Sequence, residues 1–442
     1  MSADFTGIDR IKIENYKSIQ NGSLDIAPIT VLAGANSTGK SSMLQPLLLM
    51  KQTLDAVQHH PLFLPGPNVS LSSLSQVRPR FIHKENSLLS ITVENKKVSA
   101  TSIFSSEAKE VIIERSCFKQ KQPAIPDEEI CLSKGCTADY LLNVANKIYG
   151  QHVPVQVLNK IKFALFPDRC FYSVAPIVQS LGFPSHFICP DIQGIIHLPG
   201  LRGNPQSSYV PQSLEMHPYY AGLFQFYTAS LIERWTKNGA YKAKYQKLIE
   251  YLSMLNLAAG VSTRRVNNSC LEILVGWHQS NSPSLENGKK DKDMVNITDV
   301  GVGVSQALPI LVALLTAEPN QIVYIEQPGI HLHPFAQQGL VNVIVDAALR
   351  GVKVIVETHS ATFLLALQTA IAEHLYGLTH EQVAMYWFSR VLNGSTKIEK
   401  AEIQKDGTYG TWPVDFAPVN MELHIRFAKA AEKAWKEQGD SI

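Results

Sequence analysis

The segment GANSTGKS, residues 34–41, combines glycine, hydroxyl and lysine residues at the spacing of a loop that binds phosphate. Its glycines allow backbone angles that side chains forbid, so consecutive N–H groups can turn inward around phosphate oxygens. Lys40 would place a cation beside the β- and γ-phosphates, and the Ser41 hydroxyl would ligate Mg²⁺. The alternative is a glycine-rich turn without a ligand. We predict that the phosphates of a nucleotide contact Asn36, Ser37, Thr38, Gly39, Lys40, Ser41 and Ser42.

The elements on either side of this loop are those that a phosphate loop requires. An apolar run, PITVLAG, ends at Gly34, and a helical pattern follows from about residue 40 to residue 58. The helix directs the positive end of its dipole at the bound anion. The sequence therefore predicts a buried strand, a phosphate loop and a helix in direct succession.

The C-terminal part alternates between helical and strand patterns. Helices are predicted at residues 305–316 and 335–350, and apolar strands at 322–326 and 352–357. Uninterrupted apolar strands separated by helices indicate a parallel sheet that is covered on both faces. The predicted fold class is therefore α/β.

The chain has 442 residues, which is too long for one ordinary hydrophobic core. We predict three parts. Residues 1–118 hold the phosphate loop and an antiparallel appendage at 88–115. Residues 119–290 form a largely helical insertion that is a candidate for oligomerisation or partner binding. Residues 291–442 complete the α/β domain and add a tail.

Composition limits the classes of protein. Hydrophobic residues make up 45% and charged residues 18%, as in soluble globular proteins, and the net charge of +2 gives no global attraction to nucleic acid or anionic membranes. The six cysteines lack paired C-x-x-C spacing, so reduced thiols are expected. The N-terminus has no apolar signal core, and no run approaches the roughly 18 apolar residues of a membrane span. We expect a cytoplasmic protein without a membrane partner.

Four motifs in order resemble the heads of ABC-type ATPases. They are the phosphate loop, the double-glycine segment VGVGVSQ, the acidic strand end VYIEQPGIHLHP and the strand end VIVETHS. The resemblance is closest to the RecF-like and OLD-like branch, in which NYKSI precedes the phosphate loop and HLHP follows the acidic strand. It covers residues 8–58 and 295–365 and hardly extends to the middle. It implies an ABC-type ATPase head with a mixed or parallel sheet that binds ATP and Mg²⁺.

The same resemblance implies that two chains complete each ATP site. The signature turn of one chain would cap the γ-phosphate held by the phosphate loop of another, through Gly301, Gly303 and Ser305; alternatively, this turn only packs against the sheet. His359 would reach the γ-phosphate, unless it only caps its strand. Gln76 would be the glutamine that lines the metal, unless it is only solvated.

The residue after Glu326 departs from the pattern of the family. The resemblance assigns Glu326 to the Mg²⁺-associated acid and Gln327 to the position of the glutamate that activates water. An amide can orient water but cannot accept its proton, and losing a general base typically costs about 10² to 10⁴ in rate. The hypothesis is tight ATP binding with slow or absent hydrolysis. In a competing alignment, Glu326 itself is the base.

The resemblance implies two main functions. The chain resembles the ATPase subunits of Septu anti-phage systems, which would form head-to-tail dimers or larger rings, restrain a separate HNH-type nuclease while ATP is bound, and reach DNA through that complex. No D-x-D pair follows residue 365 and no HNH-like cluster is present, so the chain itself is not expected to be a nuclease. The alternative is a DNA repair or recombination head that hydrolyses ATP while clamping duplex DNA. Its basic track would consist of Lys242, Lys244, Lys247, Arg264 and Arg265.

Overall fold

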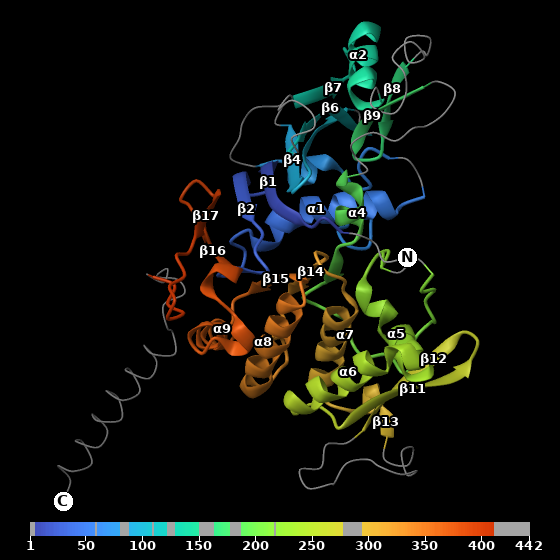
Figure 1. Cartoon of the computed structure of the whole chain (residues 1–442), viewed down its shortest axis with the longest axis vertical. Helices are drawn as coiled ribbons and strands as arrows, with labels where there is room; N and C mark the ends of the chain where they lie inside the picture. Colours follow the sequence, from blue (N-terminus) through green and yellow to red (C-terminus); the bar gives the residue numbers. More distant parts are fainter. Residues whose placement is uncertain are drawn as a thin grey trace, which may run out of the picture.

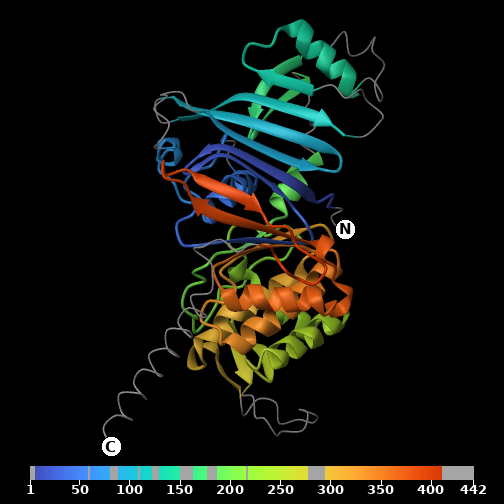
Figure 2. The same ribbon diagram turned by 90° about the vertical axis from the view of Figure 1, so that its left-hand side faces the viewer.

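The structure of the chain is a computed structural model. A central, largely parallel sheet lies between a layer that contains the helix of the phosphate loop and a second layer of several helices, and an antiparallel sheet extends the first layer (Figures 1 and 2). The described residues are 5–57, 60–79, 88–107, 110–121, 129–149, 163–176, 187–215, 218–276 and 294–410.

The central sheet has the strand order β10-β14-β15-β3-β16-β17. Neighbouring strands from β10 to β16 pair in parallel, and only β17 pairs antiparallel with its neighbour. The predicted α/β class with a mixed, mainly parallel sheet is therefore confirmed. The strands are β3 (Ile29–Gly34), β10 (Ile196–Leu198), β14 (Ile322–Glu326), β15 (Lys353–Thr358), β16 (Val383–Arg390) and β17 (Thr396–Lys400).

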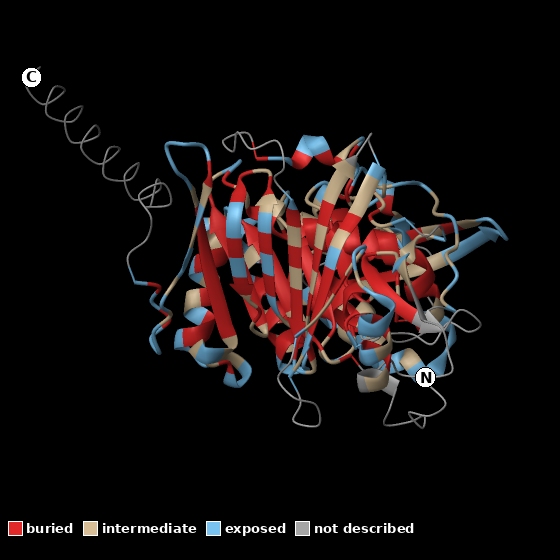
Figure 3. Cartoon of the chain, turned by 90° about the horizontal axis from the view of Figure 1, so that it is seen from above, coloured by how far each residue is buried: buried red, intermediate tan, exposed pale blue. Residues whose placement is uncertain are grey.

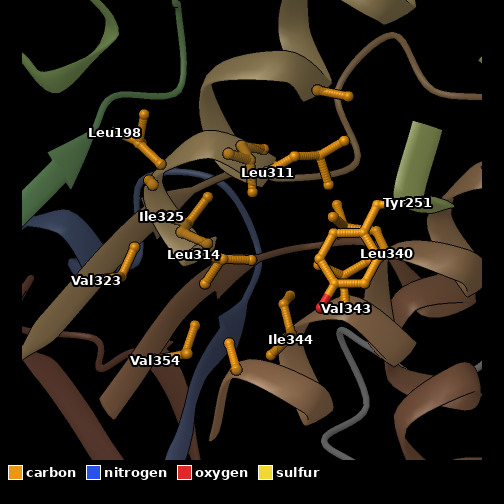
Figure 4. Close-up of a cluster of buried hydrophobic side chains, with 14 of the residues drawn as sticks. Leu198, Tyr251, Leu311, Leu314, Val323, Ile325, Leu340, Val343, Ile344 and Val354 are labelled. Carbon is orange, nitrogen blue, oxygen red and sulfur yellow. The ribbon is translucent and has the colours of Figure 1, made fainter. Parts of the chain in front are cut away.

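Alternating side chains of these strands enter two separate cores. Val323, Ile325 and Val354 face the second layer of helices, where they pack with Leu311, Leu340 and neighbouring apolar residues (Figure 4). The opposite face packs against α1 (Lys40–Asp55), which follows the phosphate loop. The helices of the first core are α5 (Thr228–Lys237), α6 (Lys242–Met254), α7 (Val302–Thr316), α8 (Pro334–Leu349) and α9 (Ala361–Ala372).

The strands predicted as an appendage at 88–115 belong to a larger sheet. This antiparallel sheet has the order β2-β1-β4-β5-β6-β7, and β4 pairs directly with β1. The N-terminal strands thus connect the added strands to the core. The strands are β1 (Ile8–Tyr16), β2 (Ile19–Asp25), β4 (Leu89–Asn95), β5 (Val98–Glu107), β6 (Glu110–Gln120) and β7 (Glu129–Ser133).

Residues 119–290 contain more strand than the predicted, largely helical insertion. Apart from α5 and α6, their described part includes the helices α2 (Ala138–Tyr149) and α4 (Cys189–Gln193). α5 and α6 are separate helices because Asn238, which caps the next turn through the N–H of Ala240, ends α5. The strands are β8 (Phe163–Asp168), β9 (Phe171–Pro176), β11 (Gly260–Asn267) and β12 (Cys270–Gly276), with β13 (Met294–Asn296) just beyond.

Short 3₁₀ helices complete the described chain. They connect longer elements and lie mostly near the surface, outside the buried strands that run through the middle of the molecule in Figure 3. They are η1 (Leu74–Val77), η3 (Phe224–Tyr227), η4 (Gly239–Tyr241), η5 (Ile297–Asp299), η6 (Leu375–Gly377) and η7 (His380–Gln382).

Two of the six cysteines form a disulfide, contrary to the expectation of reduced thiols. Cys117 on β6 and Cys131 on β7 are direct partners in the antiparallel pairing, with Cα atoms 4.1 Å apart. Their separation in the sequence hid this proximity. Within the described parts of the chain, no helix is both long and apolar enough to cross a membrane.

Candidate functional site

The phosphate loop connects β3 to α1 and takes the backbone form that its glycines allow. Gly39 has φ 104°, and a Cβ atom there would lie 2.4 Å from Oγ1 of Thr396. A side chain at this position would therefore collide with β17. Ser37, with φ 62°, and Asn36 are exposed, whereas Thr38 is buried and donates to the carbonyl of residue 35.

β16 and β17 hold the loop from the side. The guanidinium Nε of Arg390 donates to the carbonyl of Ser37 at 2.8 Å, and Oγ1 of Thr396 donates to the carbonyl of Thr38 at 2.7 Å. These bonds use loop carbonyls and leave loop N–H groups for an anion. The loop is thus supported in a shape that suits phosphate.

Lys40 lies over the loop. Its ammonium group is almost fully buried and donates to the carbonyls of Gly34 at 3.0 Å and Ala35 at 2.7 Å. Burial lowers the pKa of Lys40, while the nearby carboxylate of Glu357 acts in the opposite direction. A buried cation within this loop fits the β- and γ-phosphates of a triphosphate.

Ser41, the predicted Mg²⁺ ligand, contacts a residue that the sequence analysis missed. Its hydroxyl donates to Oε1 of Glu357 at 2.9 Å, and the Tyr324 hydroxyl donates to Oε2 at 2.9 Å. Burial, together with repulsion from Glu326, raises the pKa of Glu357. A glutamate at the end of an apolar strand, two residues before His359, was a signal that could have identified it.

Glu326 ends β14 in a different set of contacts. Its Oε1 lies 3.0 Å from Nε2 of His197, and its Oε2 accepts from the N–H of Gly200 at 3.1 Å. Burial would raise the pKa of Glu326, but the interactions with His197 and Gly200 bring it below its usual value. His197 is held by Asn68 at 3.0 Å and stacks on Tyr324. The 190–202 segment is therefore part of the site.

Gln327 follows Glu326 in a left-handed conformation, with φ 47°. Its N–H donates to the carbonyl of Glu357 at 2.8 Å, and its carbonyl accepts from the N–H of Ile330 at 3.1 Å and from Nη2 of Arg202 at 3.3 Å. These contacts hold the main chain and leave the side chain for other interactions. An amide side chain therefore directly follows Glu326 at the end of β14.

Arg202 supports the backbone at this strand end. It is 6% exposed, and its Nη1 donates to the carbonyls of Pro199 and Glu326, both at 3.1 Å. Burial lowers the pKa of Arg202 to about 10, against the attraction of Glu326. Its role is to join the 199–202 segment to the end of β14.

His359 is exposed just beyond β15 and lies close enough to Lys40 to feel its charge. Partial burial and the Lys40 ammonium together lower the pKa of His359, which favours the neutral ring. His359 follows β15 and the phosphate loop follows β3, so both lie at the same edge of the central sheet. Its assignment to the γ-phosphate stays a prediction.

The predicted signature turn opens α7, three residues earlier than expected. Gly301 precedes the helix and is exposed, and Gly303 lies beside the carbonyl of His331. The Ser305 hydroxyl donates to the carbonyl of Val302 at 2.8 Å within its own turn. Of the three residues, Gly301 is the most open to a second chain.

Gln76 borders a cavity of about 530 Å³ next to the start of α1. Its side chain accepts from the N–H of Ser72 at 3.0 Å. Three basic side chains and no acidic ones line the cavity. This positive charge suits a negatively charged nucleotide. Its lining includes Lys17, Ser18, Ser42, Gln76, Arg78 and Arg390.

Replacing Arg390 with alanine is expected to weaken ATP binding about 10-fold, the effect of losing one hydrogen bond from a charged donor. The bond to the Ser37 carbonyl would be lost, and the loop would have to be ordered by the ligand. Titration with a fluorescent ATP analogue measures the change. Arg390→Lys keeps the charge but not the Nε donor, so full affinity in that variant would assign the effect to charge alone.

Two protein-family models match the chain. One, described as "AAA ATPase domain", matches residues 7–155, and the other, described as "AAA domain, putative AbiEii toxin, Type IV TA system", matches residues 227–366. The phosphate loop, Glu326 and His359 lie within the matched segments, whereas His197 and Arg202 lie between them. The chain therefore contains a P-loop ATPase domain, and such a domain binds a nucleotide.

Solved structures of SMC head domains show a distant resemblance of shape. The SMC head domain from Thermotoga maritima is 11% identical, with 90% of this chain and 100% of that chain covered and a TM-score of 0.36. An SmcHead bound to the C-winged helix domain of ScpA is 12% identical, with 90% and 98% covered and a TM-score of 0.43. No curated protein shows significant sequence similarity to the chain.

Proposed function

We propose that the chain is an ATP-binding regulatory subunit of a bacterial anti-phage defence complex, in which ATP occupancy restrains a separate nuclease of the HNH type. The observation that carries this proposal is the amide of Gln327 directly after β14, in a chain whose phosphate-loop motif is complete. A site that binds ATP but lacks the proton acceptor reports the ATP concentration rather than consuming ATP. The toxin description of the model that matches 227–366 supports a role in defence.

The residues around the loop include groups that bind the triphosphate or Mg²⁺, whereas the amide of Gln327 cannot accept a proton. Lys40 and the loop N–H groups bind the triphosphate, and Ser41 and the neighbouring carboxylates supply hard oxygen donors, which are the ligands that Mg²⁺ prefers. Bound Mg²⁺ would neutralise phosphate charge. Gln327 can orient a water molecule, and the neutral ring of His359 can donate one hydrogen bond. Binding is thus better served than proton transfer.

The proposal requires a second chain, because Gly301 and the start of α7 would cap a partner's nucleotide. A Cβ atom built on Gly301 meets no heavy atom within 4 Å, and Val302 beside it is 43% exposed. The first N–H groups of a helix lack partners one turn earlier in the helix, so the start of α7 can bind an anion as other helix N-termini do. A head-to-tail dimer or a larger ring places this turn over the triphosphate of its neighbour.

A pair of variants tests this arrangement. Lys40→Ala is expected to abolish ATP binding, and Gly301→Glu to retain ATP binding but lose ATP-dependent dimerisation, since a carboxylate would face the partner's γ-phosphate. A mixture of the two should recover dimers that hold one ATP, because one of the two composite sites is intact. Mass photometry with and without ATP measures assembly.

Gly135→Glu is the matched control, since Gly135 is also exposed with open space around its Cβ position. It should dimerise like the unmodified chain. Full dimerisation of Gly301→Glu would contradict the two-chain site.

The nuclease part of the proposal is tested by purifying the chain together with a nuclease that a neighbouring gene encodes. DNA cleavage by the complex should fall as ATP is added, with half-inhibition near the ATP dissociation constant of the isolated ATPase chain. A non-hydrolysable ATP analogue should inhibit equally. Cleavage that requires ATP hydrolysis would refute regulation by occupancy.

The alternative, a head that clamps DNA, is not favoured by the charges on the surface. Arg264 pairs with Glu272 and Arg265 with Glu233, each at 2.6 Å, and Lys247 pairs with Glu250 at 2.8 Å. Paired charges attract phosphate less than free ones do. Salt-sensitive binding of duplex DNA by the isolated chain would restore this alternative.

A further inference from the structure

We propose that Glu357, at the end of β15, is the carboxylate that borders the Mg²⁺ position beside Ser41, and that Tyr324 positions it. The inference rests on the ATP binding of the proposed function but not on the defence role or on the rate of hydrolysis. It concerns a residue of the VIVETHS segment to which the resemblance gives no role. Glu326, to which the family pattern gives this role, is engaged elsewhere.

The distance between the two oxygens fits a shared ion. The Ser41 hydroxyl oxygen and Oε1 of Glu357 are 2.9 Å apart. Neighbouring ligands of an octahedral Mg²⁺, at 2.0–2.1 Å from the ion, are separated by about 2.9 Å. The hydrogen bond can therefore be exchanged for coordination, directly or through one water molecule, with little movement of either side chain.

Sheet topology brings β15, rather than β14, next to the phosphate loop. β15 pairs directly with β3, and Glu357 is the partner of Leu32, two residues before the loop begins. β14 lies one strand further away. A carboxylate at the end of β14 has to reach across β15 to meet Ser41.

The contacts of Glu326 direct its carboxylate toward β10, on the side of β14 that faces away from β15 and the phosphate loop. One oxygen faces the ring nitrogen of His197, and the other accepts from the backbone N–H of Gly200. Coordination of an ion would cost these bonds. Glu357 instead has one oxygen directed at Ser41 and one held by the hydroxyl of Tyr324.

Tyr324 fixes the orientation of Glu357 in the manner of outer residues around metal ligands. Its ring is fully buried against His197, so the hydroxyl has little freedom. Groups that hold metal-bound carboxylates typically contribute 10- to 100-fold to metal affinity. Tyr324 also lies between Glu326 and Glu357, and each of the two carboxylates has its own set of contacts.

The test measures how Mg²⁺ changes nucleotide affinity, without reference to turnover. A fluorescent ATP analogue is titrated into each variant in EDTA and at a series of Mg²⁺ concentrations. Glu357→Gln is expected to bind the analogue in EDTA at least as tightly as the unmodified chain, because a negative charge near the phosphates is gone. It should require about 10- to 100-fold more Mg²⁺ for the half-maximal gain in affinity.

Three further variants complete the design. Glu326→Gln is expected to change the Mg²⁺ requirement much less than Glu357→Gln does. Tyr324→Phe keeps both carboxylates but removes the positioning hydroxyl, and should raise the Mg²⁺ requirement by a smaller factor than Glu357→Gln; it also provides a test if Glu357→Gln fails to fold. Glu110→Gln, at the exposed first residue of β6, is the matched control and should show no change.

The outcomes separate this inference from the proposed function. If the unmodified chain binds no nucleotide in EDTA or Mg²⁺, the proposed function fails and the inference fails with it. If it binds, and Glu326→Gln shifts the Mg²⁺ requirement while Glu357→Gln and Tyr324→Phe do not, the inference alone is overturned. A shift confined to Glu357→Gln and Tyr324→Phe supports it.

Discussion

Replacing Gln327 with glutamate is expected to raise ATP turnover by about 10²-fold or more, with nucleotide affinity little changed. The substitution exchanges an amide for a carboxylate of the same length directly after β14, one strand away from the strand that leads into the phosphate loop. A carboxylate can take the proton of the attacking water, and a general base typically contributes about 10² to 10⁴ in rate. At position 327 the unmodified chain has an amide, which is not such an acceptor.

The local structure should accept the new side chain without rearrangement. Both main-chain groups of Gln327 are hydrogen-bonded, to Glu357, Ile330 and Arg202, and these bonds do not depend on the side chain. The left-handed φ of 47° is equally available to glutamine and glutamate. Glutamate at this position adds charge near Glu326, which Mg²⁺ would partly offset.

Single-turnover measurements of ATP cleavage, beside analogue binding, give the comparison. Gln338→Glu makes the same chemical change on the exposed face of α8 and should leave turnover unaltered. Glu326→Gln tests the competing assignment, because loss of all residual turnover in that variant would make Glu326 the base. If Gln327→Glu binds nucleotide and its turnover stays flat, the missing carboxylate does not explain slow hydrolysis.

Local patterns in the sequence were sufficient to predict three strands of the central sheet, β3, β14 and β15, and the helices α1, α7 and α8. The runs PITVLAG, IVYIE and VKVIVE are apolar without alternation, and each forms a strand buried on both faces of the sheet. The phosphate loop could be predicted because its residues are consecutive, and their contacts follow from glycine conformations and a helix start. Short-range physics determines both features.

The acidic part of the site could not be predicted in the same way, because its partners are far apart in the chain. His197 meets Glu326 across 129 positions, and Ser41 meets Glu357 across 316. Nothing in the segment HLPGLRGNP, residues 197–205, indicates that β10 joins the central sheet. A three-residue strand is too short to show a periodic pattern of apolar residues. The pairing of β4 with β1 is similarly non-local.

Replacing Arg202 with methionine is expected to lower the free energy of unfolding by about 3–5 kcal/mol. Methionine fills much of the same space but donates no hydrogen bonds. The guanidinium of Arg202 donates to the carbonyls of Pro199, Glu326 and Gln327, and hydrogen bonds from charged donors are worth roughly 1.5–3 kcal/mol each. Burial of the charge offsets part of their sum. Urea unfolding followed by circular dichroism measures the change.

The structural consequence of Arg202→Met should be confined to the end of β14, although the loss of stability is large. Released carbonyls at Glu326 and Gln327 would loosen the strand end, so ATP affinity should fall together with stability. Arg264→Met removes an exposed arginine paired with Glu272 and, as the control, should cost no more than about 1 kcal/mol. Arg202→Lys keeps the charge but cannot span three carbonyls, so it should recover only part of the loss. Equal stability of Arg202→Met and Arg264→Met would show that the 199–202 segment does not hold β14 in place.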